Sequence, residues 1–452
     1  MMSYQMGFQR ARSASDQLFV LRRILDERWR KGTATLLISI DIKQAFDLVD
    51  ISKLGTILLD LGVNPALVNR ILTACTVERT SIQWFNQRTP VVNKGRGIKQ
   101  GCPISPTLFV LILHHVLMTL KEFIPELNFE HLERIRLPCV LAYADDILLI
   151  CECEEDVERM MAILEPLLQS VGLEINMTKT KILYRDPYFT NNVSPPCTKV
   201  YGRFSLCCVT KLTYLGGVIT SSLSRKETTA DRIKKANKAF HCLCRFLKKH
   251  KLSWEVVRRL YHSLIAPVCT YSMEVATVLK QNRNALREME STMLTILRSL
   301  CSETKSSSDN DQLAPQILEG HTVNNKIRVN RLNFYGHLIR VSEQGVLKKA
   351  LRYHINGPKK MGRPAYTWKT CIQQDIERSG VSIEMWQEWA MDKEKMKTET
   401  KKLYASLIES EYDDSSESES NDSCEILPTP FEGYSDDNDS PFEGFEEEPG
   451  HM

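Results

Sequence analysis

The sequence predicts an α+β fold in which an antiparallel sheet carries acidic side chains and helical modules follow it. Two apolar runs rich in β-branched residues, LLISI at 36–40 and VLAYADDILLI at 140–150, have the composition of buried strands. The second run is interrupted by Asp145 and Asp146, as the turn of a hairpin would interrupt it. From Thr228 onward apolar residues recur every three or four positions, which indicates helices.

Composition restricts the class of protein. The 452 residues are 42% hydrophobic and 25% charged, which is ordinary for a globular chain of two or three domains. The segment from Glu409 to the end holds 16 acidic and no basic residues, so the preceding 408 residues have a net charge of about +19. A basic body of this kind suits a polyanion, and nucleic acid is the expected partner.

The sequence predicts neither secretion nor a membrane location. The fourteen cysteines show no zinc-ligand spacing and are interpreted as reduced thiols of an intracellular protein. The first residues lack the apolar stretch of a signal peptide. The longest apolar run, TLFVLIL, is too short to cross a bilayer.

The first elements alternate between helix and strand. Helical spacing begins near Ser15, and the strand at 36–40 ends at Asp41. We expect the chain to turn into a helix over 43–49, so that Asp41 is either a helix cap or an acid held at the end of a core strand for a ligand. Helices are predicted to continue over 51–83.

A loop rich in glycine and proline, at 95–106, opens the next helix. It is either a place where the backbone approaches a ligand closely or simply a loop and a helix start. After the acidic hairpin we expect a helix over 156–171, then a turn and strand over 172–183. A second hairpin is predicted over 211–220, with its turn at the glycine pair.

The predicted helical part begins with a basic amphipathic helix from Thr228. Its lysine-rich faces are either solvated surface or a groove for a phosphate backbone. Further helices are expected at 254–265 and 284–300, followed by a polar linker near 302–312. The acidic tail from about Glu409 is disordered by composition.

Three acids form the most informative pattern. Asp41 lies at the end of one predicted strand, and Asp145 and Asp146 lie 104 and 105 residues later at the turn of the hairpin. Three carboxylates on neighbouring strands make an oxygen-rich site suited to two Mg²⁺ ions, the arrangement that catalyses nucleotidyl transfer. Taken alone, the tetrapeptide YADD fits a surface turn equally well.

Five stretches in order resemble the motifs of reverse transcriptases, and among them those of non-LTR (LINE-type) retrotransposons. These stretches are SIDIKQAFD, KGRGIKQGCPISPTLF, AYADD, GLEINMTKTK and YLGG. GFQRARSASDQLFVLRRIL before them, and RLNFYGHLIRV with GRPAYTWKTC after them, are also similar to segments of these elements. The resemblance covers about residues 7–220 specifically and extends loosely to about 380.

The resemblance implies a right-hand polymerase. Its palm carries the antiparallel sheet, its fingers are partial, and its thumb is helical. The implied divisions are 1–220 for partial fingers and palm, 221–301 for the thumb, 302–315 for a linker, 316–408 for a basic helical C-terminal segment, and 409–452 for the acidic disordered tail.

The resemblance also implies roles for individual residues. The catalytic residues and metal ligands would be Asp41, Asp145 and Asp146, which would hold two Mg²⁺ ions, or Mn²⁺. The nucleotide-binding residues would be Ile42 through its carbonyl, Phe46, Gln100, Gly101 and Lys179, and the Phe46 ring would exclude a ribose 2′-hydroxyl. The primer grip would be Leu215 and Gly216.

The implied activity is RNA-directed DNA polymerisation, which adds dNTPs to a primer 3′-hydroxyl on an RNA template, with a DNA primer or target as a further partner. Family members carry more fingers and an endonuclease domain upstream of the stretch that begins this sequence, so an N-terminally truncated product is expected. A separate departure is Gln9, which stands where arginine is usual. Without those fingers the triphosphate would lose charge-assisted contacts. The alternatives are a catalytically inactive nucleic-acid-binding protein derived from a retrotransposon and, more remotely, a metal nuclease. The basic run PKKMGR at 358–363 favours the nucleus over the cytoplasm.

Overall fold

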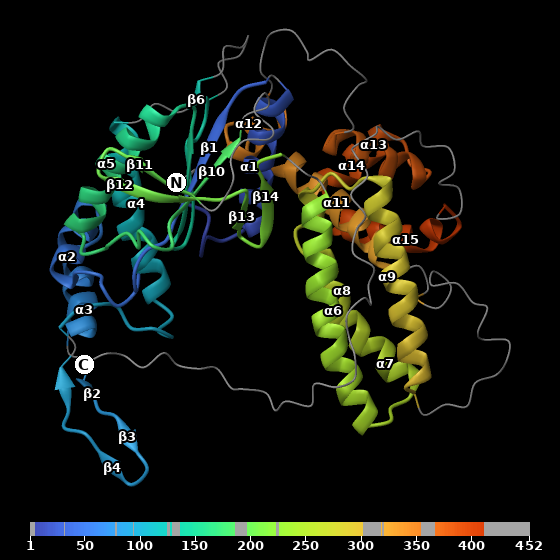
Figure 1. The fold of residues 1–452 in the computed structure, drawn as a ribbon, viewed down its shortest axis with the longest axis horizontal. Coiled ribbons are helices and arrows are strands. Elements are labelled where there is room, and N and C mark those ends of the chain that lie inside the picture. The colour runs from blue at the N-terminus through green and yellow to red at the C-terminus, as the bar shows by residue number, and fades with distance from the viewer. Residues whose placement is uncertain are drawn as a thin grey trace.

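The computed structural model describes most of the first 410 residues. The described ranges are 5–30, 32–76, 79–93, 95–123, 127–128, 136–185, 197–222, 226–301, 318, 321–353 and 367–410. The predicted linker at 302–315, the basic run at 358–363 and the tail beyond 410 lie outside them. Figure 1 shows a body built around a sheet on one side and a long helical bundle on the other, with further helices above the bundle.

A six-stranded sheet forms the centre of the first body. Its strands are β1 (Thr35–Ile40), β8 (Val140–Tyr143), β9 (Asp146–Cys151), β10 (Lys181–Arg185), β11 (Cys197–Tyr201) and β12 (Phe204–Cys208). They lie in the order β11-β12-β10-β1-β9-β8, so β1 is central and runs antiparallel to both β9 and β10. This arrangement confirms the predicted antiparallel core of the sheet and the acidic hairpin β8–β9.

One strand pair departs from the predicted antiparallel pattern. β12 runs parallel to β10 and pairs with it over two positions, so the whole sheet is mixed. The physical reason is that β11 and β12 form their own antiparallel hairpin, which joins the edge of the sheet through its second strand. The parallel pairing is confined to the edge of the sheet formed by β11 and β12. Both strands that flank β1 run antiparallel to it.

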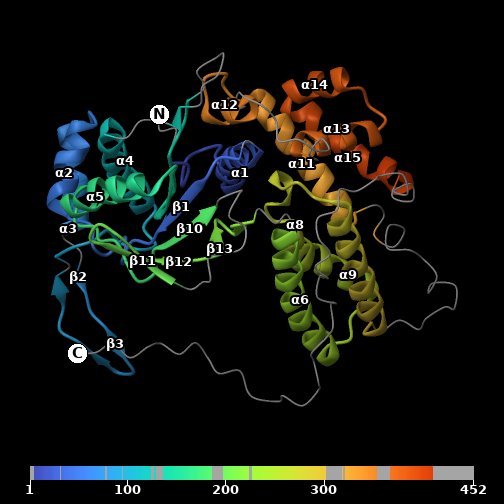
Figure 2. The same cartoon turned by 45° about the horizontal axis from the view of Figure 1, so that its top comes forward.

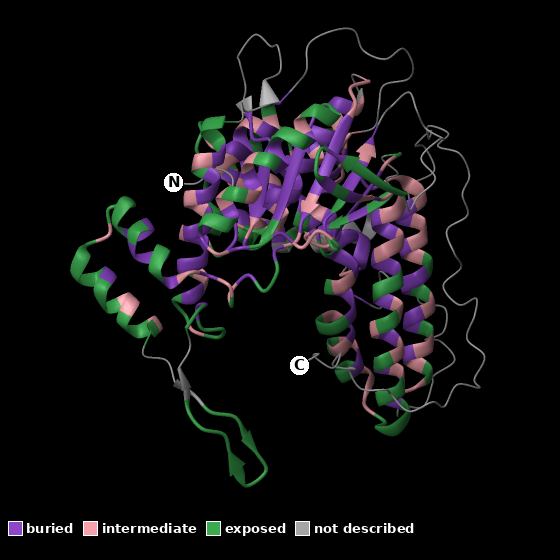
Figure 3. Ribbon diagram, turned by 60° about the vertical axis from the view of Figure 1, so that its left-hand side comes forward, coloured by how far each residue is buried: buried purple, intermediate pink, exposed green. Residues whose placement is uncertain are grey.

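Helices cover the sheet because its central strands are apolar on both faces. In Figure 3 these strands are almost wholly buried, and a continuous apolar run such as 36–38 requires cover on both sides. The covering helices are α1 (Ala14–Arg30), α4 (Ser105–Phe123) and α5 (Glu154–Ser170). The start of α1 is fixed by a reciprocal cap, in which the Asp16 amide donates to Ser13 Oγ and the Ser13 amide donates to Asp16 Oδ2.

Helix α4 also bears on the membrane prediction. Among the described residues, it is the one helix long and apolar enough to cross a membrane, and 44% of its most apolar 18-residue stretch is buried inside the protein. The unbroken apolar run TLFVLIL covers only part of this helix, and one helix that passes this test is weak evidence for a membrane span. Core helices of soluble proteins meet the same two criteria.

The predicted helix over 43–49 is wrong. These residues form turns, because loop amides bond their carbonyls in place of helical partners: Gly97 N donates to Val49 O and Ile98 N donates to Phe46 O, at 2.9 and 2.8 Å. Helix α2 (Ile51–Asp60) begins only after Asp50, whose carboxylate accepts from the Ser52 amide.

The helical prediction over 51–83 holds as far as Thr76. Helix α3 (Pro65–Thr76) follows α2, and the chain then forms two short antiparallel ladders that project from the body in Figure 1. The ladders are made by β2 (Arg79–Thr80), β3 (Gln83–Trp84), β4 (Gln87–Arg88) and β5 (Val92–Asn93). Two further pairs of short strands are β6 (Leu127–Asn128) with β7 (Arg136–Leu137), and β13 (Lys211–Tyr214) with β14 (Gly217–Thr220). The reversal between β3 and β4 is a two-residue turn in which Phe85 takes a left-handed φ of 49°.

Helices form the rest of the described chain. They are α6 (Lys226–Lys249), α7 (Trp254–Leu260), the π-helical turn η1 (Tyr261–Ile265), α8 (Ala266–Thr270), the 3₁₀ turn η2 (Met273–Val275), α9 (Lys280–Ser299), α11 (Val323–Arg340), α12 (Val346–Arg352), α13 (Trp368–Arg378), α14 (Ile383–Met391) and α15 (Lys393–Ser410). Figures 1 and 2 both show α6 and α9 side by side, and we call the group from α6 to α9 the α6–α9 bundle. The helical positions predicted from Thr228 onward are confirmed.

Helix α11 belongs to two hydrophobic cores at once. Its first turns place Val323 and Ile327 in the core of the α6–α9 bundle. Its later turns place Leu332 and Leu338 in the large core that also contains the sheet. The helix is therefore a shared structural element of both bodies.

Candidate active site

The strand register brings the predicted acids to one edge of the sheet. Along the β1–β9 pair the last partners are Ile40 and Ile147, so Asp41 and Asp146 come next at facing positions. Asp145 lies beside them in the β8–β9 turn, after Ala144, which has a left-handed φ of 56°. Asp41 and the adjacent pair Asp145 and Asp146, which are distant in sequence, thus come to the same edge of the sheet, where β1 ends and β9 begins.

Electrostatics supports this grouping. Asp146 is exposed at the edge of the sheet, but desolvation by the surrounding protein raises the pKa of its carboxyl above the usual value, and the negative charges of Asp145 and Asp41 raise this pKa further. The mutual repulsion shows that the three groups interact. Within the described ranges, however, no three His, Cys, Asp or Glu side chains form a set placed to hold a metal ion. The metal site therefore stays a prediction.

The raised pKa of Asp146 predicts that Asp146→Asn stabilises the metal-free protein. A folded-state pKa above the unfolded value gives stability that is present at low pH and is lost as the pH rises through the folded pKa. At neutral pH the charged Asp146 carboxylate therefore destabilises the folded protein, and asparagine, which carries no charge, removes this destabilisation. We expect a higher melting temperature for the variant at pH 7 in EDTA, and a difference that shrinks toward pH 4.

Thermal unfolding between pH 4 and pH 8 measures this effect. Asp60→Asn, at the exposed end of α2, is the control for the loss of a surface carboxylate outside the site. A melting temperature of Asp146→Asn equal to or below that of the unmodified protein at pH 7 would contradict the prediction.

The acidic turn is held by an N-terminal segment that sequence reasoning missed. Gln5 Nε2 donates to the Ala144 carbonyl at 3.0 Å, and the Ala144 amide donates to Gln5 Oε1 at 2.9 Å. The same Oε1 accepts from the Gly7 amide at 2.7 Å. Gln5 is 1% exposed, so this bracket of hydrogen bonds is shielded from water. In the sequence, the one sign of this contact is Gly7 in the GFQRAR stretch, because a glycine permits close approach to another backbone segment.

The loop at 95–101 contacts the chain that follows Asp41. Gln100 Nε2 donates to Asp47 Oδ2 at 3.1 Å, and the Ile98 amide donates to the Phe46 carbonyl. Gly101 has a φ of 81°, and a side chain there would meet none of the described atoms within 4 Å. Phe46, Gln100 and Gly101 are thus brought to one region beside the acidic edge.

The Phe46 ring is fixed by a second aromatic ring. It stacks on Phe109 of α4, with a centroid separation of 5.0 Å and an interplanar angle of 18°. Phe46 is itself half-buried, so it keeps a partly open face.

Ile42 directly follows Asp41, and Lys179 lies in the turn that follows Ile175, the residue that pairs with Ile42. An antiparallel bridge pairs Ile42 with Ile175. Its two hydrogen bonds run from the Lys43 amide to the Glu174 carbonyl and from the Asn176 amide to the Asp41 carbonyl, so neither bond involves the carbonyl of Ile42. Asp41 N donates to Thr180 Oγ1 at 3.3 Å, next to the exposed Lys179. Both predicted residues therefore adjoin the first acid.

Leu215 and Gly216 form a two-residue turn in a separate hairpin. They have φ values of 46° and 72° and connect β13 (Lys211–Tyr214) to β14 (Gly217–Thr220). Tyr214 Oη donates to the Leu141 carbonyl at 3.3 Å, which ties this hairpin to the strand that leads to the acidic turn.

The bundle holds the same turn from the other side, through residues that sequence reasoning missed. Tyr271 Oη donates to the Leu215 carbonyl at 3.3 Å, and the Arg232 guanidinium donates to the Gly216 carbonyl. The Arg232 guanidinium also lies 4.8 Å from the centroid of the Tyr271 ring. The predicted primer-grip turn thus lies between the sheet and the bundle.

Comparison with known proteins defines the class. Residues 1–219 match the family of reverse transcriptases, described as RNA-dependent DNA polymerases. This match covers 219 of the 452 residues, just under half of the chain. The match and the curated relatives support the resemblance to reverse transcriptases of non-LTR retrotransposons.

Two curated relatives illustrate the match. A Pol polyprotein of a type-1 retrotransposable element R2 from Popillia japonica is 25% identical over 267 residues, which are 56% of this chain and 42% of the relative. The transposon TX1 149 kDa protein of Xenopus laevis is 28% identical over 170 residues, covering 37% of this chain and 13% of the relative. The chain therefore spans less than half the length of either relative.

Two solved structures show a loose overall likeness. Both are yeast telomerases in complex with the TWJ fragment of telomeric RNA. That of Candida tropicalis is 12% identical, with a TM-score of 0.39, and the match covers 86% of this chain and 53% of the telomerase. That of Candida albicans is 13% identical, with a TM-score of 0.39 and coverage of 84% and 53%.

Proposed function

We propose that this chain is an RNA-directed DNA polymerase that extends a primer 3′-hydroxyl with dNTPs on an RNA template. The observation that carries the proposal is the register that places Asp41 opposite Asp146, with Asp145 in the adjoining turn. The match of residues 1–219 to reverse transcriptases supports the same activity.

Divalent metal ions fit this group of residues by their chemistry. The donors are carboxylate oxygens, which hard cations prefer, and the repulsion that raises the pKa of Asp146 is what a cation would relieve. Asp41, Asp145 and Asp146, with the carbonyl of Ile42, would hold two Mg²⁺ ions, and Mn²⁺ could replace them. Bound there, the ions supply activation of the attacking hydroxyl and charge stabilisation of the departing phosphate.

The other site residues would bind and orient the nucleotide and primer. The Phe46 ring, steadied by Phe109, would exclude a ribose 2′-hydroxyl and so select dNTPs. Gln100 and Gly101 would line the nucleotide pocket, and the exposed Lys179 would meet the triphosphate. The Leu215–Gly216 turn would position the primer end.

Template and primer binding fits the charge of the helical part. The lysines of α6 at 234, 235, 238, 248 and 249 are exposed, while its apolar residues face the bundle core. The assignment of 1–220 as partial fingers and palm and 221–301 as thumb belongs to this proposal, as does 316–408 as a nucleic-acid-binding segment. The basic run at 358–363 supports a nuclear location.

Primer extension on a poly(rA)/oligo(dT) duplex tests the proposal. We expect dTTP incorporation that requires Mg²⁺ and the RNA template and that stops in EDTA. If the protein binds the duplex but incorporates no nucleotide, the polymerase proposal fails. The basic surface of α6 would then favour the second function, that of a nucleic-acid-binding protein derived from a polymerase.

A further inference from the structure

The β3–β4 hairpin projects from the body that contains the sheet. In Figures 1 and 3 it extends away from that body, and every residue from 81 to 91 is exposed. The hairpin therefore adds little to the hydrophobic core. Its side chains are instead accessible to a ligand.

The tip of the hairpin holds two large aromatic side chains in water. Trp84 and Phe85 are 72% and 83% exposed, and their rings meet edge to face with centroids 5.4 Å apart. Large aromatic side chains usually stabilise a protein by being buried. Two adjacent exposed rings at a projecting tip therefore indicate a binding surface.

Phe85 occupies a backbone position that disfavours it. Its φ of 49° lies in the left-handed region, where a hairpin turn favours glycine or asparagine. Burial does not offset this strain, because the ring is almost wholly exposed. A strained residue that gives the fold so little in return is typical of a functional position.

The polar groups around the tip suit a nucleic acid. Between residues 79 and 100 the sequence has five basic residues and no Asp or Glu. Gln83 Oε1 accepts from Arg88 Nε and Nη2 at 3.3 and 3.1 Å, which orients an exposed guanidinium on one face of the ladder. Trp84 lies on the other face, opposite Gln87. Basic groups beside aromatic rings bind the backbone and the bases of a single strand.

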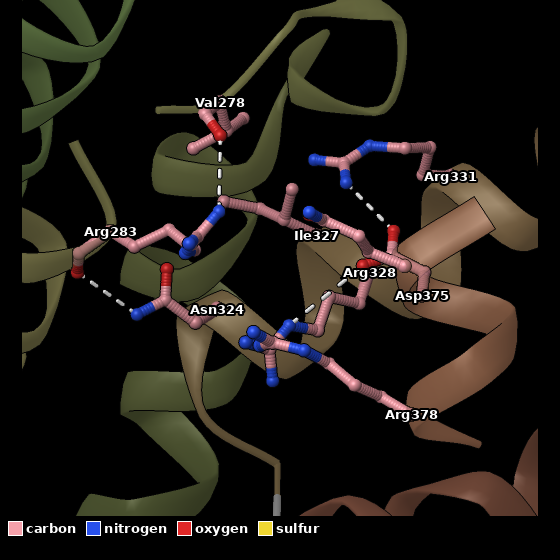
Figure 4. Close-up of a pocket in the computed structure, with 9 residues that line it drawn as sticks. Val278, Arg283, Asn324, Ile327, Arg328, Arg331, Asp375 and Arg378 are labelled. Atoms are coloured by element: carbon pink, nitrogen blue, oxygen red, sulfur yellow. Dashed lines mark hydrogen bonds and ion pairs between the residues drawn. The ribbon is translucent and has the colours of Figure 1, made fainter. Parts of the chain in front are cut away.

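The buried arginines of the C-terminal part differ from Arg88. Where the start of α9 meets α11 and α13, the arginine side chains are packed against protein groups (Figure 4). Arg331 Nη1 donates to Asp375 Oδ2 at 2.7 Å, and Arg283 Nη1 donates to the Val278 carbonyl at 3.3 Å. These arginines therefore have a structural role, whereas Arg88 is accessible from solvent.

The chain connects the hairpin directly to the candidate active site. Asn93, which ends the ladder at the hairpin base, is four residues from Gly97, so the two lie at most about 14 Å apart. Gly97 and Ile98 donate to the carbonyls of Val49 and Phe46, on the side of the acids where the nucleotide would bind. On that side, the template beyond the incoming nucleotide is unpaired.

We propose that the β3–β4 hairpin binds the unpaired RNA template, with bases stacked on Trp84 and Phe85 and the phosphate backbone at Arg88. Every base has a face that can stack, so recognition is independent of sequence. The identity of the strand as template rests on the proposed function, whereas stacking requires only a single strand. Ile82 and Val91 are also exposed, so contact with another protein is the competing outcome.

Fluorescence anisotropy in EDTA, without dNTPs, tests the proposal. Two probes share one RNA/DNA duplex, and one of them adds a 5′ single-stranded RNA overhang. We expect Trp84→Ala to bind the overhang probe at least about fivefold more weakly than the unmodified protein, and the blunt probe equally. Trp84→Phe keeps a ring and should retain most of the affinity. Phe123→Ala, which removes an exposed ring at the end of α4, is the matched control and should bind both probes normally.

The salt dependence of binding separates stacking from charge. Arg88→Gln should lower the slope of log affinity against log salt by about one, because one phosphate contact is lost. Trp84→Ala should leave this slope unchanged. Both side chains are exposed, so neither substitution disturbs a core, and equal melting temperatures verify this.

Two results would overturn the proposal. One is that Trp84→Ala binds the overhang probe as the unmodified protein does, and a change in its oligomeric state, measured by light scattering, would then assign the tip to a protein contact. The other is an equal loss of affinity for both probes. The assay contains neither metal ion nor dNTP, so it can be read even if the unmodified protein extends no primer.

Discussion

Asp145→Asn is expected to abolish primer extension, with a fall in rate of about a thousandfold or more, equivalent to about 4 kcal/mol of transition-state stabilisation. Asparagine has nearly the same shape as aspartate but lacks its negative charge. Asp145 is exposed in the β8–β9 turn, so the change disturbs no buried packing. The variant should therefore fold and bind template–primer as the unmodified protein does.

The comparison isolates chemistry from binding. Extension of poly(rA)/oligo(dT) is measured beside the affinity for the same duplex, with Asp60→Asn as a control for a surface carboxylate outside the site. If Asp145→Asn extended the primer at the rate of the control, the acidic edge of the sheet would not be the catalytic site.

Gly7→Ala should reduce extension by about a hundredfold, although Gly7 has no side chain to contribute to catalysis. A Cβ at this position would lie 3.0 Å from the Cα of Ala144 and closer still to its backbone nitrogen. The acidic turn would have to shift, and a displacement of about 1 Å at a reacting group costs about two orders of magnitude in rate. The Gln5 bonds to Ala144 would be strained by the same movement.

Gly95→Ala is the matched control for this glycine. Gly95 is exposed, and a Cβ there would meet none of the described atoms within 4 Å, so the substitution should leave extension unchanged. The melting temperature of each variant separates a local shift of the turn from general unfolding. Full activity of Gly7→Ala would show that the N-terminal segment does not position the acids.

The sequence was informative where a pattern is local. Apolar runs interrupted by acids located β1, the β8–β9 hairpin and the three aspartates, because burial on both faces of a strand leaves a clear composition. The helix predicted over 43–49 failed for a non-local reason. The carbonyls of Phe46 and Val49 accept hydrogen bonds from a loop about fifty residues later, and spacing alone cannot reveal such partners.

The supporting residues were missed for the same reason. Gln5 and Ala144 are 139 positions apart, and Tyr271 and Leu215 are 56 apart. A glutamine or a tyrosine carries no mark of its backbone partner, so these roles emerge only from the fold. The parallel β10–β12 pair likewise depends on how an edge hairpin docks.

The sharing of α11 between two cores has a consequence for how the molecule comes apart. Separating the α6–α9 bundle from the C-terminal helices would expose Val323 and Ile327 on one side of a continuous helix, while Leu332 and Leu338 still anchor its other end. Loss of packing in the α6–α9 bundle would therefore weaken the packing of the C-terminal helices, and the reverse also holds. The two regions should therefore behave as one cooperative unit, in which hydrogen exchange is slow across the junction and local opening is confined to the periphery.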